Sequence, residues 1–283
     1  MSHPFTGALS RVARRVRRSP ALLVGGSLLA LSLVAVLLSC TFYEGNPLAI
    51  VAAPFIEPGT ESAHPLGTDM LGRDMLAQLV HGARISLLTG LLAAAVAVLL
   101  GVLVGVLGGY FGGRVDAVCT RITELFQTLP QLLLAIVLIA VLTPSVWNTM
   151  LAIGVTSWPQ IARIVRPEIM RLRQADFVHA ASLSGMGDAR IIWHEVLPNI
   201  GSIVVALASI LVATAILTES ALSFLGLSDP NVASWGAMIG AGRSVLRDAG
   251  YMAALPGFAI LITVLAFTLV GNGLNDALNR RRQ

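Results

Sequence analysis

The 283-residue chain contains no lysine, and all 19 of its basic residues are therefore arginines. A Walker-type phosphate-binding loop needs its lysine, so the chain is not itself a P-loop ATPase of the usual kind. Charged residues make up only 12% of the chain, about half of what a soluble domain of this size carries. Cysteine is scarce too, and the two that occur, Cys40 and Cys119, fit no metal-ligand spacing.

Apolar residues take the place of the missing charge. They make up 55% of the chain, and the mean hydropathy is +0.80. These residues gather in blocks long enough to cross a bilayer, which takes about 20 residues, and the blocks do not alternate as barrel strands do. The sequence therefore predicts an all-α, polytopic membrane protein.

The uncharged stretches predict six transmembrane helices. One stretch runs for 29 residues between Arg84 and Arg114, after an amphipathic lead-in at 75–84. Another runs for 38 residues, 125–162, which suits two spans joined by a tight hairpin at Pro144. The six candidate spans are 21–40, 85–113, the two halves of 125–162, 200–218 and 252–271.

Local signals add detail to these spans. Residues 110–124 are predicted to form a short polar turn, and Pro130 and Pro159 are expected to kink their helices. The second span carries three glycines four residues apart, which place small residues on one face and suit close helix packing in lipid. These glycines are Gly101, Gly105 and Gly109.

The arginines set the orientation. With the N-terminus inside, 15 arginines lie in the inner segments, and only Arg73, Arg84, Arg243 and Arg247 lie outside. This asymmetry follows the positive-inside rule, so both termini and residues 176–198 are expected in the cytoplasm. The basic balance is explained by topology, and nucleic acid binding is not required. Cysteines on opposite membrane faces would not pair.

The first apolar stretch has two interpretations. Residues 37–40 (Leu-Leu-Ser-Cys) resemble a lipoprotein cleavage site at Cys40, and Arg14-Arg15 resembles a twin-arginine signal. The stretch is longer than the core of a typical signal peptide, and further spans follow it. We therefore expect a retained helix.

Residues 176–198 form the long polar interval between the fourth and fifth spans. The pattern predicts two short helical pieces joined at a glycine corner, where Gly185 and Gly187 permit a sharp turn. Small residues on the first piece offer a face on which another surface can sit, so we expect a docking element. Its alternative is an ordinary turn that packs on its own chain.

Glu219 is the one acidic residue inside a predicted span. Such a carboxylate is a candidate for lining the path or pairing with a partner subunit. Its place near the outer end would let it reach interfacial water, which favours a structural role. The external tryptophans and Tyr251 are expected to be interfacial anchors. No catalytic or metal-binding arrangement stands out, so we expect a protein that is not an enzyme.

The polar interval resembles the signature of ABC-importer permeases: Glu-Ala-Ala, three residues, Gly, nine residues, an Ile-like residue, one residue, Leu-Pro. Here His179 stands where the family usually has Glu, and Glu195 occupies the Ile-like position. The resemblance implies that this loop carries a coupling helix that docks into a groove of a cytoplasmic ATPase. The implied docking residues are His179, Ala180, Ala181, Ser182, Leu183, Gly185, Leu197 and Pro198.

Further stretches are similar to the second permease of dipeptide and oligopeptide importers, a family that also carries nickel chelates. The resemblance covers about residues 60–276, and its stretches are 64–74, 82–87, 108–116, 219–227 and Pro230 with Ser234-Trp235-Gly236. It implies a basic cytoplasmic tail at 1–20, a first span and extracytoplasmic loop at 21–83, a type I permease core at 84–276 and a cytoplasmic tail at 277–283.

The resemblance implies a permease subunit that moves peptides, or a similar small solute, across a prokaryotic cytoplasmic membrane by alternating access. Implied partners are a second homologous permease, two ABC ATPase domains that bind ATP and Mg, and an extracytoplasmic solute-binding lipoprotein. No cofactor is expected in this chain. A stand-alone secondary carrier or channel, or a membrane scaffold, remain alternatives, and the cargo is not determined by the sequence.

Overall fold

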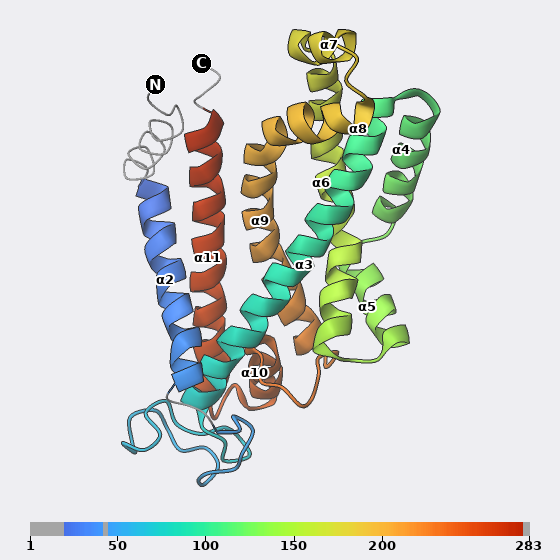
Figure 1. Ribbon diagram of the computed structural model, residues 1–283. Helices are drawn as coiled ribbons and strands as arrows, with labels where there is room; N and C mark the ends of the chain where they lie inside the picture. Colours follow the sequence, from blue (N-terminus) through green and yellow to red (C-terminus); the bar gives the residue numbers. More distant parts are fainter. Residues whose placement is uncertain (1–19, 42–44, 280–283) are drawn as a thin grey trace.

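The computed structural model describes residues 20–41 and 45–279. Most of this part of the chain is helical, and helix α2 (Pro20–Thr41) packs beside the last helix, α11 (Tyr251–Asn279) (Figure 1). The basic tail at 1–19, the side chain of Cys40 and the arginines at 280–282 lie outside the described residues.

The centre of the fold is the pair α3 (Met75–Phe111) and α6 (Val146–Arg173), which pack against each other over many residues (Figure 1). The three glycines on α3 face α6, as predicted. A Cβ atom added at Gly101 would lie 2.5 Å from Ile161 Cβ, and one at Gly109 would lie 2.6 Å from the Arg166 carbonyl oxygen. The helices approach this closely because those side chains are absent.

The prediction of a polar turn at 110–124 is wrong. The chain bends at Gly112 and Gly113, where φ is +68° and +52°, and then forms helix α4 (Gly113–Gln127). Apolar residues recur along α4 at helical spacing among the charged ones, so the segment is an amphipathic helix. The apolar series is Val115, Val118, Ile122 and Leu125.

The hairpin expected at Pro144 is present, and at Pro130, where a kink was expected, the chain breaks between two helices. Helix α5 (Gln131–Leu142) follows α4 after residues 128–130 at an angle of 83°. The hairpin 143–145 then leads into α6, where the Ser145 hydroxyl accepts a hydrogen bond from Asn148 N as the N-cap. At Pro159, α6 continues as one helix.

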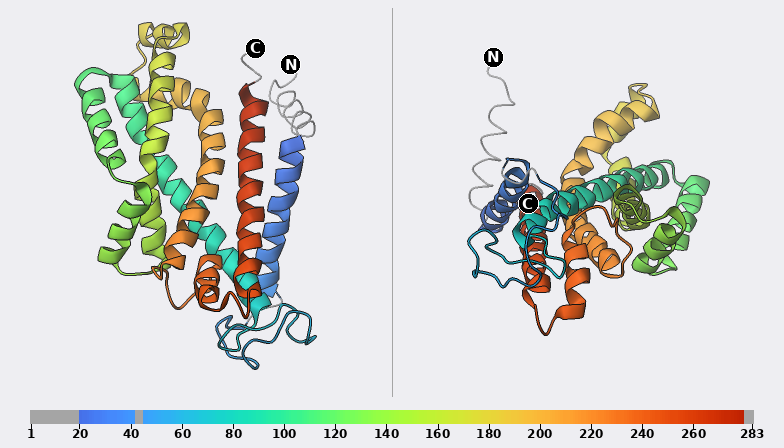
Figure 2. Two further views of the ribbon diagram at one scale, coloured as in Figure 1. Left: turned by 180° about the vertical axis from the view of Figure 1, so that it is seen from behind. Right: turned by 90° about the horizontal axis from the view of Figure 1, so that it is seen from below.

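Beyond α6 lie α7 (Asp176–Leu183), α8 (Asp188–Ile191), a π-helical turn (Ile192–Val196) and α9 (Leu197–Phe224). Helix α10 (Trp235–Gly242) and a short 3₁₀ turn (Arg243–Val245) precede α11. The start of α2, the end of α11 and helix α7 lie at one end of the molecule, whereas α10 and residues 45–74 lie at the other (Figure 2).

Within residues 20–41 and 45–279, three helical stretches are long and apolar enough to cross a membrane: Met75–Phe111, Asp188–Phe224 and Tyr251–Ala277. The bent pair α4 and α5 makes a fourth if it counts as one broken span. The division expected at residue 83 falls inside α3, which takes in the amphipathic lead-in at 75–84.

Residues 45–74 form an ordered loop at the end opposite α7. Positive φ angles at Gly67 and Gly72 allow their backbones to pass close to residues 52–56 of the same loop. An added Cβ would lie 2.2 Å from Ile56 O at Gly67 and 2.1 Å from Ala52 O at Gly72. The Asp69 carboxylate accepts hydrogen bonds from two backbone amides and from Gln78 Nε2. The stretch 64–74 thus specifies a loop conformation.

Exchanging Gly105 for leucine is expected to destabilise the protein, because an added Cβ would lie 2.9 Å from Val165 Cγ1. Overpacking of this kind costs about 1–3 kcal/mol. Thermal unfolding of the purified protein in detergent measures the effect. The control is Gly257→Leu on α11, where an added Cβ meets no atom within 4 Å. Equal unfolding temperatures for both variants would contradict the close α3–α6 packing.

Candidate functional site

Helix α7 projects from the end of the molecule that also holds the start of α2 (Figure 1). Its buried anchor is Val178, and the segment behind it is anchored by Ile191, which is 1% exposed. By contrast, Leu183 is 89% exposed and Phe177 is 40% exposed. An apolar side chain as exposed as Leu183 at the tip of a helix suits a contact with another protein surface.

The structure places most of the predicted docking residues on this helix. His179, Ala180, Ser182 and Leu183 are exposed, and Ala181 is partly buried. Leu197 and Pro198 lie elsewhere, in the first turn of α9. The predicted set therefore divides into an exposed helix and a turn at the base of the loop.

Gly185 forms the corner predicted from the sequence. Its φ is +80°, Gly185 N donates to Ser182 O, and Met186 N donates to Ala181 O. This pair of hydrogen bonds is a Schellman motif, which ends a helix at a residue in the left-handed region. A side chain at Gly185 would have open space, so the constraint at this position is the backbone angle alone.

Pro198 has a structural role that the sequence did not indicate. Proline has no backbone N–H, so it cannot donate to the residue four positions earlier. The chain widens into the π-helical turn just before it, with Leu197 N donating to Ile192 O, and Asn199 Nδ2 donates to Glu195 O at 2.6 Å. The helical path therefore continues from Asp188 to Phe224 through the proline.

Tyr110 and Asp188 attach the loop to the centre of the fold. The Tyr110 hydroxyl, at the end of α3, donates to Asp188 Oδ1 at 3.0 Å, and the Arg173 guanidinium lies 6.0 Å above the Tyr110 ring. Sequence reasoning missed both residues. The available signal for Tyr110 was a polar aromatic residue between the glycine pairs 108–109 and 112–113.

Arg166 on α6 is paired with a neighbouring helix. Its guanidinium forms a bidentate ion pair with Asp116 on α4. Gly108 leaves room for this contact, because an added Cβ would lie 3.2 Å from Asp116 Oδ1. The stretch 108–116 therefore joins α3, α4 and α6 at the α7 end.

Glu219 is buried, and the expectation that it reaches interfacial water is wrong. Its side chain is 4% exposed, accepts a hydrogen bond from Ser223 Oγ at 2.7 Å, and lies 3.4 Å from Ser86 Oγ on α3. Trp235 N in turn donates to Ser86 Oγ at 3.3 Å. One carboxylate thus links α9, α3 and the start of α10.

Trp235 is not an interfacial anchor. It is 3% exposed, and its indole Nε1 donates to Leu79 O at 2.9 Å. Gly82 makes room for the ring, because an added Cβ would lie 3.0 Å from Trp235 Cδ1. Tyr251 also bonds to protein, with its hydroxyl 2.7 Å from Thr68 O. These contacts fix α10 and the start of α11 to α3 and to the loop 45–74.

The apolar helices place the chain in the class of helical membrane proteins, with α7 exposed at one end. The chain belongs to the family described as binding-protein-dependent transport system inner membrane components, which matches residues 97–283. This is the permease family of ABC importers, and its members are not themselves the catalytic subunits.

Similar proteins carry peptide-transport names. The chain is 34% identical over 278 residues to the dipeptide transport system permease protein DppC of Alkalihalophilus pseudofirmus, covering 98% of this chain and 90% of that one. It is 39% identical over 222 residues to the di/tripeptide transport system permease protein DppC of Pseudomonas aeruginosa, covering 78% and 73%.

One solved structure shares the fold. It is a chain of the MetNI methionine ABC transporter in inward-facing conformations, with a TM-score of 0.59 at 19% identity. The match covers 72% of this chain and 97% of that chain. The type I permease fold predicted from the sequence is therefore present.

Replacing Tyr110 by phenylalanine is expected to loosen the loop, because it removes the hydrogen bond to Asp188. A hydrogen bond of this kind contributes about 1 kcal/mol, so amides in 176–191 should exchange about fivefold faster. Hydrogen–deuterium exchange of the purified protein measures this rate. Tyr251→Phe is the control, since it removes a hydroxyl at the opposite end. Unchanged exchange in 176–191 would show that Tyr110 does not hold the loop.

Glu219→Ala is expected to lower the unfolding temperature, because it leaves the Ser86 and Ser223 hydroxyls without their acceptor. Unpaired buried polar groups cost about 1–3 kcal/mol each. Glu219→Gln keeps an acceptor oxygen and should lose less. Thermal unfolding of the two variants in one detergent gives the comparison, and equal losses would argue against the hydrogen-bonded arrangement.

Proposed function

We propose that this chain moves di- or oligopeptides across a membrane as the permease subunit of an ATP-driven importer. The observation that carries the proposal is the exposed helix α7, which is followed, after the corner at Gly185, by the helical run 188–224 that Tyr110 holds through Asp188. The peptide cargo is supported by the names of the similar permeases, which transport dipeptides and di/tripeptides.

The proposed topology has six spans: α2, α3, the broken pair α4–α5, α6, α9 and α11. The α7 end is proposed as cytoplasmic, because residues 163–190, which carry five arginines, lead to that end. The start of α2 and the end of α11 lie at that same end (Figure 2). The location that follows is the inner membrane of a prokaryote, with both termini in the cytoplasm.

The proposed partners follow from the family. Two cytoplasmic ATPase domains bind ATP and Mg, and one of them receives α7 of this chain. A second homologous permease completes the pathway, and an extracytoplasmic solute-binding lipoprotein delivers the cargo. This chain itself holds no cofactor and makes or breaks no bonds.

The proposed mechanism is alternating access. A displacement of α7 is passed to α3 through the Tyr110–Asp188 hydrogen bond and to α9 through the helical run that begins at Asp188. Rigid helices that move as units are a known form of switching transition. The ATPase moves the docked helix α7, and the resulting reorientation of α3 and α9 opens or closes the path.

Two alternatives differ from this proposal, one in its cargo and the other in its energy source. A nickel-chelate or other small-solute importer of the same family would differ only in its cargo. A stand-alone carrier or channel would transport without ATP. Purification of the tagged chain with its partners, followed by uptake of labelled dialanine into vesicles with and without ATP, separates these possibilities.

Exchanging Gly185 for valine is expected to reduce ATP-dependent uptake by about tenfold, because a branched residue resists the left-handed angle by about 1–2 kcal/mol. Uptake is lost because the altered corner misplaces α7, and the insertion of the chain into the membrane should be unchanged. The control is Gly187→Val, two residues away, where φ is −69° and the space is open. Normal uptake by the Gly185 variant would refute the assigned role of the corner.

A further inference from the structure

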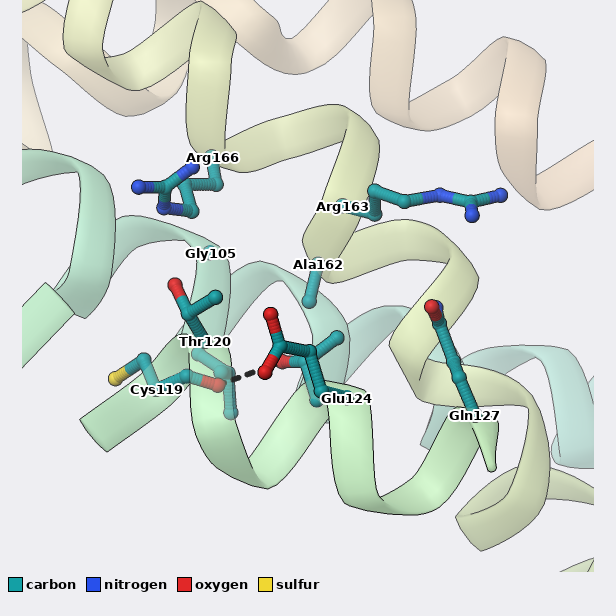
Figure 3. Close-up of a pocket in the computed structure, with 10 residues that line it drawn as sticks. Gly105, Cys119, Thr120, Glu124, Gln127, Ala162, Arg163 and Arg166 are labelled. Atoms are coloured by element: carbon teal, nitrogen blue, oxygen red, sulfur yellow. Dashed lines mark hydrogen bonds between the residues drawn. The ribbon is translucent and has the colours of Figure 1, made fainter. Parts of the chain in front are cut away.

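A polar groove runs between α4 and α6 and around the break between α4 and α5. It consists of two adjoining cavities of about 260 and 380 Å³, both lined by Gln127 and Arg163. Figure 3 shows the first cavity, where Glu124 points into the space between the two helices and Arg163 extends past Gln127. We name this continuous feature the polar groove.

Two glutamine side chains of the polar groove lie where contact with lipid would be unfavourable. Gln131 begins α5 and Gln160 lies in α6, within the 38 uncharged residues of the proposed hairpin of spans. Gln160 is nevertheless exposed on the surface of this chain. An amide facing hydrocarbon costs free energy, so polar side chains in spans face a cavity or the interior of a bundle.

The break between α4 and α5 independently indicates that this region lines a cavity and does not face lipid. The two helices meet at 83°, and residues 128–130 between them are not helical. Irregular backbone at membrane depth is tolerated where it is buried in protein or lines a water-filled cavity. Leu129 and Pro130 line the second cavity, so here the break borders the polar groove.

The two glutamines are held in place by neighbours. Gln131 Nε2 donates to Ser157 Oγ at 2.7 Å, and Gln160 Nε2 donates to Gln131 Oε1 at 2.8 Å. Each amide nitrogen has a second hydrogen, and Gln160 Oε1 has no protein donor among the described residues. The pair therefore presents both donors and an acceptor, as a peptide backbone requires.

The charges of the groove lie toward the α7 end. Glu124 is paired with Arg121, and Arg166 is paired with Asp116. Arg163 has no acidic partner within 4 Å among the residues that the structure describes. An exposed guanidinium beside neutral amides matches a ligand with a carboxylate and a peptide bond.

We propose that the polar groove is the surface on which this permease holds its cargo in transit, with Gln131 and Gln160 bonding the peptide backbone and Arg163 the terminal carboxylate. This inference rests on the proposed function. The alternative occupant of the groove is the headgroup of an anionic lipid, which offers Arg163 a phosphate in place of a carboxylate.

The test uses the purified importer with its partners in vesicles, after Cys40 and Cys119 are replaced by serine. Gln160→Cys is expected to react with a charged methanethiosulfonate reagent, and dialanine during ATP-driven uptake should protect it. Leu133→Cys is the matched control, because Leu133 is also exposed on the hairpin but carries an apolar side chain. It should not react.

Several outcomes would overturn the inference. They are an unreactive Gln160→Cys, labelling that dialanine does not change, and protection that depends on anionic lipid and not on peptide. A second variant, Gln160→Leu, should reduce uptake at low dialanine about fivefold while peptide-independent ATPase activity stays unchanged, and Gln174→Leu at the end of α6 should not. If the unaltered importer takes up no dialanine at all, the proposed function fails instead.

Discussion

The close contact between α3 and α6 is the constraint on which the rest of the structure depends. Lipid is as apolar as leucine, so helices in a membrane associate through close packing and hydrogen bonds. Glycines at 101, 105 and 109 let α3 lie against α6, and Gly154 on α6 accommodates Val96 in return. At one end of α3, Tyr110 holds the projecting loop, and near the other end Gly82 makes room for Trp235.

Hydrogen bonds and an ion pair also join the helices, in addition to the close packing that the glycines allow. The carboxylate of Glu219 joins α9 to α3 through Ser86, and Ser86 also accepts from the backbone of α10. The Arg166–Asp116 ion pair does the same for α6 and α4 at the opposite end. Each of these contacts joins two helices, so together they set the positions of α4, α6, α9 and α10 relative to α3.

Much of the fold was predictable because it depends on local pattern. Uncharged runs located the helices, proline located the break and the hairpin, and Gly185 located the corner of the loop. The prediction of a polar turn at 110–124 was wrong because the charged residues there belong to an amphipathic helix. The burial of Glu219 and Trp235, the Arg166–Asp116 pair and the groove around Gln160 depend on residues distant in sequence, which spacing along the chain does not report.

The length of α3 has a mechanical consequence. Its 37 residues span about 55 Å, whereas the hydrocarbon core of a bilayer is about 30 Å thick. Helix α3 is therefore strongly inclined to the other helices (Figure 1). A rod set obliquely across a layer moves sideways at its far end when it is pushed along its axis. A push on its α7 end would therefore shift the loop 45–74 laterally, and α10 with it.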